Sequence, residues 1–178
     1  MLCGIDEAGR GPIAGDLVVA GCIFKEAAKI EGLNDSKKIN EKKREKLYEE
    51  IILQTHYNIV TISSKEIDAL GISKCMTKAL EKIKQTLKAE RYLFDGNTSF
   101  GVEGLETMVK ADTKVAEVSA ASILAKVTHD RNIIKDAKIY PEYGFENNKG
   151  YGTKAHIEMI KKYGYSPIHR KSFKLKDV

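Results

Sequence analysis

Residues 4–15 have the sequence "GIDEAGRGPIAG", in which two adjacent carboxylates, Asp6 and Glu7, follow a short apolar run. The apolar residues 1–5 predict a strand that leads into this stretch. Residues 16–24 are apolar and rich in β-branched side chains without a helical period, which predicts a second strand. The stretch is therefore interpreted as the end of one strand and the turn into the next, with two charges where binding sites commonly form.

Patterns typical of strands and helices follow one another along the rest of the chain. Further strands are predicted at residues 57–63, 91–96 and 105–112, and helices at residues 41–53, between Ser63 and Gly71, and at 73–88, 116–136 and 154–163. This mixture predicts a layered α/β domain. Because there is no internal repeat and no long linker, residues 1–178 are expected to form a single domain, with a small C-terminal part from about residue 140.

The composition indicates a globular protein with a modest basic excess. The chain has 178 residues, 42% of them hydrophobic and 31% charged, and its formal net charge of +5 permits an anionic partner. Residues 36–46 carry six basic and two acidic side chains, and residues 161–178 carry six basic and one acidic. Each run is explained equally well by a solvated helix face or tail and by contacts to a polyanion.

The cysteines and the N-terminus indicate the compartment. Cys3, Cys22 and Cys75 show no CxxC spacing, and an odd number of cysteines without motif spacing is typical of free thiols in a reducing environment. The N-terminus has no signal-peptide pattern, and no apolar run is long enough to span a bilayer. We therefore expect a cytoplasmic protein that is not in a membrane.

Four acidic residues lie at strand ends or before a helix. Asp6 and Glu7 end the first strand, Asp95 ends the strand at 91–96, and Asp112 precedes the long helix. If these strands are neighbours, four carboxylates crowd one edge of the sheet, and a divalent cation would relieve their repulsion. Oxygen ligands without His or Cys favour Mg²⁺ or Mn²⁺, and two such ions about 4 Å apart can activate water for phosphodiester hydrolysis.

Taken singly, these residues have simpler explanations. An Asp before Gly, such as Asp95, is usually a turn former, and Asp112 could cap a helix. Adjacent residues on a regular strand also point to opposite faces, so Asp6 and Glu7 can serve together only if the chain bends. Gly9 and Gly11 make such a bend feasible.

A dinucleotide-binding fingerprint is the competing interpretation of the same stretch. Gly9, Gly11 and Ala14 match its glycine spacing, but the fingerprint requires a helix directly afterwards to face the pyrophosphate. Here Pro12 is followed by a strand pattern, and the carboxylates upstream would repel phosphate unless a metal ion screened them. The match is interpreted as accidental.

Seven blocks of the sequence, in order, resemble the motifs of the ribonuclease HII family. They are "GIDEAGRGPIAG" (4–15), "LNDSKKI" (33–39), "FDGN" (94–97), "KAD" (110–112), "SAASILAKVTHDR" (119–131), "KGYGT" (149–153) and "HRKSF" (169–173). The first and fifth blocks are long and specific, and the resemblance covers nearly the whole chain. One departure is His129, which stands where the family usually has arginine.

The resemblance implies a ribonuclease H-like fold, with a central mixed β-sheet flanked by helices and a short C-terminal helical segment. It implies an endonuclease that hydrolyses the RNA strand of RNA–DNA hybrids and nicks duplex DNA at embedded ribonucleotides. The expected products carry 3′-hydroxyl and 5′-phosphate ends, the expected cofactors are two Mg²⁺ or Mn²⁺ ions, and the expected assembly is a monomer. The C-terminal part, about residues 140–178, is expected to contact the substrate.

The resemblance also assigns individual residues. The family's four metal-binding carboxylates correspond to Asp6, Glu7, Asp95 and Asp112. Its loop that reads the ribose 2′-hydroxyl corresponds to Gly9, Arg10 and Gly11, and its junction-sensing tyrosine corresponds to Tyr151.

These assignments fit the chemistry. Glycines allow backbone donors to approach a sugar, the 2′-hydroxyl distinguishes RNA from DNA, and the Arg10 guanidinium can grip a phosphate. Tyr151 can pack on the neighbouring deoxyribose, although by itself it could be a surface aromatic residue. The alternative function is a non-catalytic nucleic-acid-binding protein, which has no use for four carboxylates facing phosphate.

Overall fold

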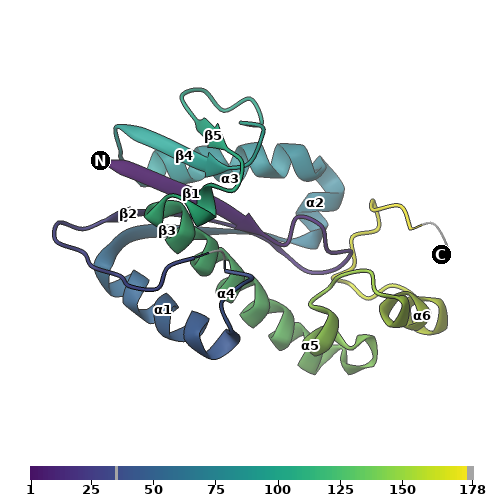
Figure 1. Cartoon of the computed structure of the whole chain (residues 1–178). Helices are drawn as coiled ribbons and strands as arrows, with labels where there is room; N and C mark the ends of the chain where they lie inside the picture. Colours follow the sequence, from purple (N-terminus) through teal and green to yellow (C-terminus); the bar gives the residue numbers. More distant parts are fainter. Residues whose placement is uncertain (35, 176–178) are drawn as a thin grey trace.

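The computed structural model describes residues 1–34 and 36–175 of the chain. Asp35 of the 33–39 motif and Lys176 of the terminal basic run lie outside the described residues. Five strands form one mixed sheet in the order β3-β2-β1-β4-β5, shown in Figure 1. The strands are β1 (Leu2–Ala8), β2 (Leu17–Phe24), β3 (Thr55–Ile62), β4 (Arg91–Asp95) and β5 (Glu106–Met108).

The pairing of β1 positions the first two acidic strand ends. Strand β1 is antiparallel to β2 and parallel to β4, with Ile5 opposite Phe94. The next residues along these two strands are Asp6 and Asp95. Because neighbouring strands lie about 4.8 Å apart and side chains alternate between faces, both carboxylates are directed to the same face of the sheet.

Helix α4 (Ala116–Ile139) covers that face, and helix α1 (Glu41–Gln54) packs on α4 (Figure 1). Small residues such as Ala120 and Ala121 allow a close approach and are fully buried. A side chain at Gly4 would place its Cβ 2.2 Å from the backbone carbon of Glu117, so only glycine fits there. The other face is covered by α2 (Ser64–Leu70) and α3 (Ile72–Thr86).

The C-terminal elements pack around a smaller hydrophobic cluster that includes Tyr143, Phe145 and Ile160. They are η2 (Pro141–Tyr143), α5 (Phe145–Asn148) and α6 (Lys154–Tyr163). The backbone between β1 and β2 lies against them, since the N–H of Ile13 donates to the Gly150 carbonyl at 2.9 Å. The glycine-rich loop therefore connects the sheet with the C-terminal part, at the right of Figure 1.

The α/β class, the mixed sheet and the predicted helices are confirmed, with differences at some boundaries. The first strand continues through Asp6 and Glu7 to Ala8. The strand predicted at 105–112 ends at Met108, because Lys110 adopts a left-handed conformation with φ of 58° and starts the short helix η1 (Ala111–Thr113). Within the described residues, the helices are too short or too polar to cross a bilayer.

Candidate active site

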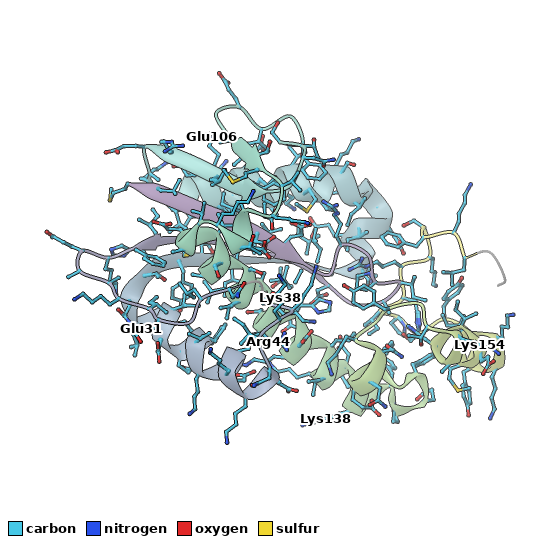
Figure 2. The ribbon with its side chains drawn as sticks, in the orientation of Figure 1. Glu31, Lys38, Arg44, Glu106, Lys138 and Lys154 are labelled. Carbon is cyan, nitrogen blue, oxygen red and sulfur yellow. The ribbon has the colours of Figure 1, made fainter. Side chains whose placement is uncertain are left out.

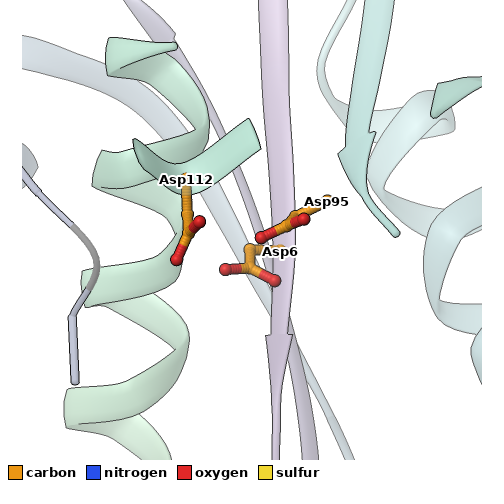
Figure 3. A group of neighbouring side chains, drawn as sticks. All are labelled: Asp6, Asp95 and Asp112. Atoms are coloured by element: carbon orange, nitrogen blue, oxygen red, sulfur yellow. The ribbon is translucent and has the colours of Figure 1, made fainter. Parts of the chain in front are cut away.

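Three aspartates meet on the face of the sheet that α4 covers, near the C-terminal ends of β1 and β4. Oxygen atoms of Asp6 on β1, Asp95 on β4 and Asp112 on η1 all lie within 4.8 Å of one another. Figure 3 shows the three carboxylates pointing toward a common space. Residues that are far apart in sequence thus form a compact set of oxygen donors.

Regular backbone structure holds each of these carboxylates. Asp6 is 8% exposed, and its Oδ1 accepts a hydrogen bond from the Glu7 N–H at 2.8 Å. The Oδ1 of Asp95 accepts from the Ala111 N–H at 3.3 Å, which ties the end of β4 to the short helix that carries Asp112. The left-handed residue Lys110 makes this turn. The sheet and η1 therefore set the spacing of the three carboxylates.

The electrostatics of the cluster are those of a cation site. Burial, together with repulsion from Glu7 and Asp95, raises the pKa of Asp6 well above its usual value. The Glu7 N–H and Ser122 oppose this increase by hydrogen bonding to the carboxylate. Buried like charges are unfavourable unless a counter-charge is present, and hard oxygen donors suit Mg²⁺ or Mn²⁺.

Glu7 lies beside this cluster but outside it. Because β1 remains regular, Glu7 starts on the opposite face from Asp6, opposite Val19 of β2. Its Oε1 forms an ion pair with Arg10 at 3.2 Å. Burial raises the pKa of Glu7, with Arg10 opposing the increase and Asp95 adding to it. Its Oε2 is buried and has no hydrogen-bond partner among the described residues, so this oxygen is available to a ligand.

A cleft of about 310 Å³ contains all eight residues that the sequence analysis singled out. Its lining residues are Asp6, Glu7, Ala8, Gly9, Arg10, Gly11, Ser36, Lys37, Asp95, Asp112, Ser122, Lys126, His129 and Tyr151. The three clustered aspartates are called the acidic side of the cleft, and the Gly9–Gly11 loop with Tyr151 is called the loop side.

The two glycines of the loop are needed for different reasons. Gly9 has φ of +82°, and a Cβ there would lie 2.5 Å from the Asp16 carbonyl oxygen and 2.5 Å from the His129 ring. Gly9 is therefore required by the fold. A Cβ on Gly11 would lie 3.6 Å from Cε1 of Tyr151, an ordinary van der Waals contact. A side chain at Gly11 would fit the protein and instead occupy space in the cleft.

The loop after α5 presents the Tyr151 ring. Tyr151 is 45% exposed, although its backbone is well held. Its N–H donates to the Asn148 carbonyl at 2.9 Å, and its carbonyl accepts from the Thr153 N–H at 2.9 Å and from the His156 ring at 2.8 Å. An exposed aromatic ring on a fixed backbone is a suitable packing surface for a sugar or base.

The sequence analysis did not single out several polar residues of the cleft. Four of them lie inside the 33–39 and 119–131 blocks: Ser36, Lys37, Ser122 and Lys126. The blocks therefore indicated this part of the cleft, although no single residue in them did. The hydroxyls of Ser122 and Ser36 are hydrogen-bonded at 2.8 Å, which joins the two blocks.

His129, noted in the sequence as a departure from the family, also faces the cleft. It is 2% exposed, and its Nδ1 lies 3.1 Å from Oδ1 of Asp130, which also accepts from Lys126 at 2.9 Å. Its Nε2 is buried without a hydrogen-bond partner in residues 1–34 and 36–175. This unsatisfied ring nitrogen lies next to Gly9, in a residue that lines the cleft.

Most of the described basic residues of the two runs are exposed, and Arg170 is a buried exception. Lys42, Lys43 and Lys46 are exposed on α1. Figure 2 labels Arg44 on the side of the molecule that carries α1 and α4. In the C-terminal run, by contrast, Arg170 is only 1% exposed and bonds to protein carbonyls. For this residue the expectation of a contact to the nucleic-acid backbone is wrong, because its guanidinium is inside the protein.

Comparisons with known proteins point to one family. The family model described as Ribonuclease HII matches residues 3–176. The chain is 62% identical over 175 residues to a ribonuclease HII of Sulfurovum sp. (strain NBC37-1), which covers 98% of this chain and 92% of that relative.

Solved structures of similar proteins have the same fold. A ribonuclease HII from Archaeoglobus fulgidus, solved in a complex with PCNA, has a TM-score of 0.85 and 28% identity and covers 100% of this chain and 97% of its own. A more distant likeness is Bst-RNase HIII, solved in complex with Mn²⁺, with a TM-score of 0.71 and 20% identity, covering 92% of this chain and 62% of its own.

Proposed function

The chain belongs to the ribonuclease HII family and is therefore a metal-dependent endonuclease that hydrolyses the RNA strand of RNA–DNA hybrids, and we propose which of its residues perform this reaction. Asp6, Glu7, Asp95 and Asp112 hold two divalent ions at the scissile phosphate. The observation that carries this proposal is the set of three aspartates within 4.8 Å, in one cleft with Glu7, Arg10 and Tyr151.

The donor chemistry fits the proposed ions. The candidate ligands are carboxylates, the pKa of Asp6 is raised by burial and repulsion, and the buried Oε2 of Glu7 lacks a partner among the described residues. When bound, two such ions supply activation of the attacking water and charge stabilisation at the phosphate. Mg²⁺ or Mn²⁺ are the proposed ions, and the distant ribonuclease HIII solved with Mn²⁺ supports this choice.

The other side of the cleft selects the ribonucleotide. The backbone of Gly9, Arg10 and Gly11 faces the ribose, where its N–H groups can donate hydrogen bonds to the 2′-hydroxyl. Arg10, which pairs with Glu7 in the structure, is placed to contact a phosphate. Tyr151 packs on the next sugar, where a 2′-hydroxyl would disturb the contact. This arrangement would direct nicking to an embedded ribonucleotide.

The cationic side chains of the cleft attract the phosphate backbone. Lys37 and Lys126 line the cleft on the side of α1 and α4, and they offset the repulsion between phosphate and the acidic cluster. We further propose that residues 1–178 act as one monomeric cytoplasmic domain, in which residues 140–178 contact the duplex. A binding protein without catalysis is disfavoured, because a buried cluster of carboxylates weakens phosphate binding unless metal is held there.

The test is cleavage of a DNA duplex that carries one ribonucleotide, with and without divalent metal. We expect one nick next to the ribonucleotide in Mg²⁺ or Mn²⁺, a 3′-hydroxyl and a 5′-phosphate, and no cleavage in a chelator. An all-DNA duplex of the same sequence is the matched control. Binding to both duplexes without cleavage in either metal would instead support the non-catalytic alternative.

A further inference from the structure

Arg170 is the largest of the fully buried side chains. It lies at the C-terminal end of the chain, far in sequence from the cleft, and its guanidinium inserts beneath the loop that joins β1 to β2. Four backbone carbonyls of this loop accept its hydrogen bonds. Its Nη2 donates to Gly9 at 2.6 Å, its Nη1 to Pro12 at 2.8 Å and Arg10 at 3.2 Å, and its Nε to Gly15 at 3.0 Å.

The surroundings of the guanidinium are suited to a permanent charge. Burial lowers the pKa of Arg170 to about 10, and Asp16 opposes the decrease, so the group remains charged at neutral pH. The guanidinium also lies over the Phe173 ring, with Cζ 5.1 Å from the ring centroid. Carbonyl dipoles and a ring face are favourable partners for a buried cation. A planar group with five donors can reach four carbonyls at once, which an ammonium cannot.

The residue before Arg170 supports Tyr151 in a similar way. The Ser166 N–H donates to Nδ1 of His169 at 2.8 Å, so neutral His169 carries its proton on Nε2. That Nε2 lies 2.9 Å from Nε2 of His156, which must then accept and carry its own proton on Nδ1. Nδ1 of His156 in turn donates to the Tyr151 carbonyl at 2.8 Å. The hydrogen bonds thus run in one direction, from Ser166 to the backbone of Tyr151.

Backbone hydrogen bonds join these two supports. The N–H of Arg170 donates to the Ile13 carbonyl at 2.8 Å, and the N–H of Gly15 donates to the Ile168 carbonyl at 2.9 Å. On its other side the loop packs so closely on Gly150 that no side chain fits there, since a Cβ would lie 2.4 Å from the Ala14 carbonyl oxygen. The loop and the Tyr151 segment are therefore held against each other and against the same C-terminal segment.

We propose that residues 166–170 form a positioning device that sets the distance between the Gly9–Gly11 backbone and the Tyr151 ring. Arg170 is the positioning residue for the loop, and His169 with His156 positions Tyr151. Neither contacts the reacting atoms. The inference rests on the proposed function, because it matters for catalysis only if this loop and Tyr151 read the substrate.

The two arms of the device predict different kinetic effects. Arg170→Lys keeps the charge but loses most of the carbonyl contacts, so the loop shifts and kcat/KM falls about 100-fold on both an all-RNA hybrid and a single-ribonucleotide duplex. His156→Phe keeps an aromatic ring of similar size but frees the Tyr151 backbone. It lowers nicking of the single-ribonucleotide duplex by roughly tenfold relative to cleavage of the hybrid, because part of the stacking contact is lost.

Ile160→Val is the matched control, because Ile160 is buried in the same C-terminal cluster and touches neither the loop carbonyls nor the two histidines through a hydrogen bond. All proteins are assayed well below their melting temperatures, with folding checked by circular dichroism. The control is expected to lose some stability and to keep the wild-type rates and substrate ratio. Equal rate losses in Ile160→Val and Arg170→Lys would show that the role is only structural and overturn the proposal.

Further outcomes separate the proposal from its premise. Folded Arg170→Lys with wild-type kcat/KM on both substrates overturns the Arg170 arm. If Arg170→Lys does not fold, His156→Phe decides alone, and an unchanged substrate ratio overturns the proposal. If Gly11→Val and Tyr151→Ala also leave the wild-type rates and ratio unchanged, the assignment of the loop and Tyr151 to substrate reading has failed first.

Discussion

The two sides of the cleft are built by opposite means. On one side, regular strands and a short helix hold Asp6, Asp95 and Asp112 close together, although the charges repel and burial raises the pKa of Asp6. On the other side, the irregular loop around Gly9 adopts a positive φ, and the buried Arg170 holds its carbonyls. The acidic side reduces stability in return for metal binding, whereas the loop side depends on interactions that stabilise the fold.

This difference predicts which substitutions separate stability from activity. Neutralising a carboxylate removes a metal ligand, so activity falls. It also removes repulsion between buried charges, so the protein stays folded. Changing the support of the loop leaves the metal ligands in place. It exposes buried polar groups or leaves them without hydrogen-bond partners, so stability and substrate choice change together. The following predictions test this separation, beginning with the largest expected effect.

Asp6→Asn and Asp95→Asn are expected to reduce cleavage by more than about 100-fold, because the loss of a ligand exceeds the effect of losing a residue that only orients one. Hybrid binding should persist, since cationic residues such as Lys37 and Lys126 remain. The melting temperature without metal should stay equal or rise, because a charge has been removed from a repelling cluster. The measurements are initial cleavage rates in Mg²⁺, hybrid binding in a chelator, and thermal unfolding.

Either variant with near wild-type cleavage would remove that residue from the ligand set. A melting temperature well below that of the wild type would contradict the view that the acidic side is under electrostatic strain. Glu66→Gln is a useful comparison, since this carboxylate is on α2, outside the cleft, and forms an ion pair with Lys78. It should leave cleavage unchanged.

Tyr151→Ala and Gly11→Val should differ from each other in their effects on the two substrates. Tyr151→Ala removes a packing surface of the kind worth about 1–3 kcal/mol, so nicking at a single ribonucleotide should fall more than cleavage of an all-RNA strand. Gly11→Val should reduce both, because a β-branched side chain fills the space where the ribose approaches. Relative cleavage rates of the two substrates are the measurement. Equal losses in Tyr151→Ala would mean that this residue does not sense the junction.

The histidine pair on the loop side should make part of the stability depend on pH. Burial, with repulsion from His156, lowers the pKa of His169 from 6.5 to about 4. The unfolded chain therefore binds more protons than the folded one between these values, and the contribution of His169 is complete above pH 6.5 and lost as the pH falls toward 4. Such a shift is worth about 3 kcal/mol.

The measurement is the difference in unfolding free energy between the wild type and His169→Asn across this pH range. The comparison cancels the opposite effect of the acidic cluster, whose raised pKa values favour the folded state as the pH falls. We expect a difference that is largest near pH 7 and shrinks toward pH 4. A difference that does not vary with pH would mean that His169 is not held neutral in the folded protein.

The smallest effect is expected for the exposed lysines of α1. Reversing Lys42, Lys43 and Lys46 to Glu should weaken hybrid binding and flatten its dependence on salt concentration, by about one unit of slope for each phosphate contact that is lost. Reversing Lys74, Lys82 and Lys88, which are exposed on or next to α3, makes the same change in net charge on the other face of the sheet. Equal slopes for the two triple variants would mean that the α1 lysines form only a solvated helix face and do not contact phosphates.

The acidic side could be predicted from the sequence because regular elements build it. Apolar runs identified the strands that carry Asp6 and Asp95, and the helix pattern at 116–136 located Asp112 before its start. The prediction for 105–112 was too long, because the left-handed turn at Lys110 depends on packing rather than on periodicity. The sequence analysis expected a bend in the chain to bring Glu7 beside Asp6, but β1 stays regular to Ala8, and Glu7 still lines the cleft.

The support of the loop by Arg170 could not be predicted, because its contacts join residues more than 150 positions apart. In the sequence Arg170 is one of six basic residues in a terminal run, and the "HRKSF" block that contains it does not show which of its residues is buried. His156 and His169 are likewise isolated histidines without ligand spacing. Their roles follow from burial and hydrogen bonding, which appear only when the chain returns to the loop between β1 and β2.

The most direct test of the separation between the two sides is Mn²⁺ binding, measured by calorimetry without substrate, in the wild type, Asp95→Asn and Gly11→Val. Both variants are expected to lose cleavage. The account predicts that Asp95→Asn binds Mn²⁺ much more weakly than the wild type, whereas Gly11→Val binds it with wild-type affinity. Equal loss of Mn²⁺ affinity in both variants, or wild-type affinity in Asp95→Asn, would contradict the account.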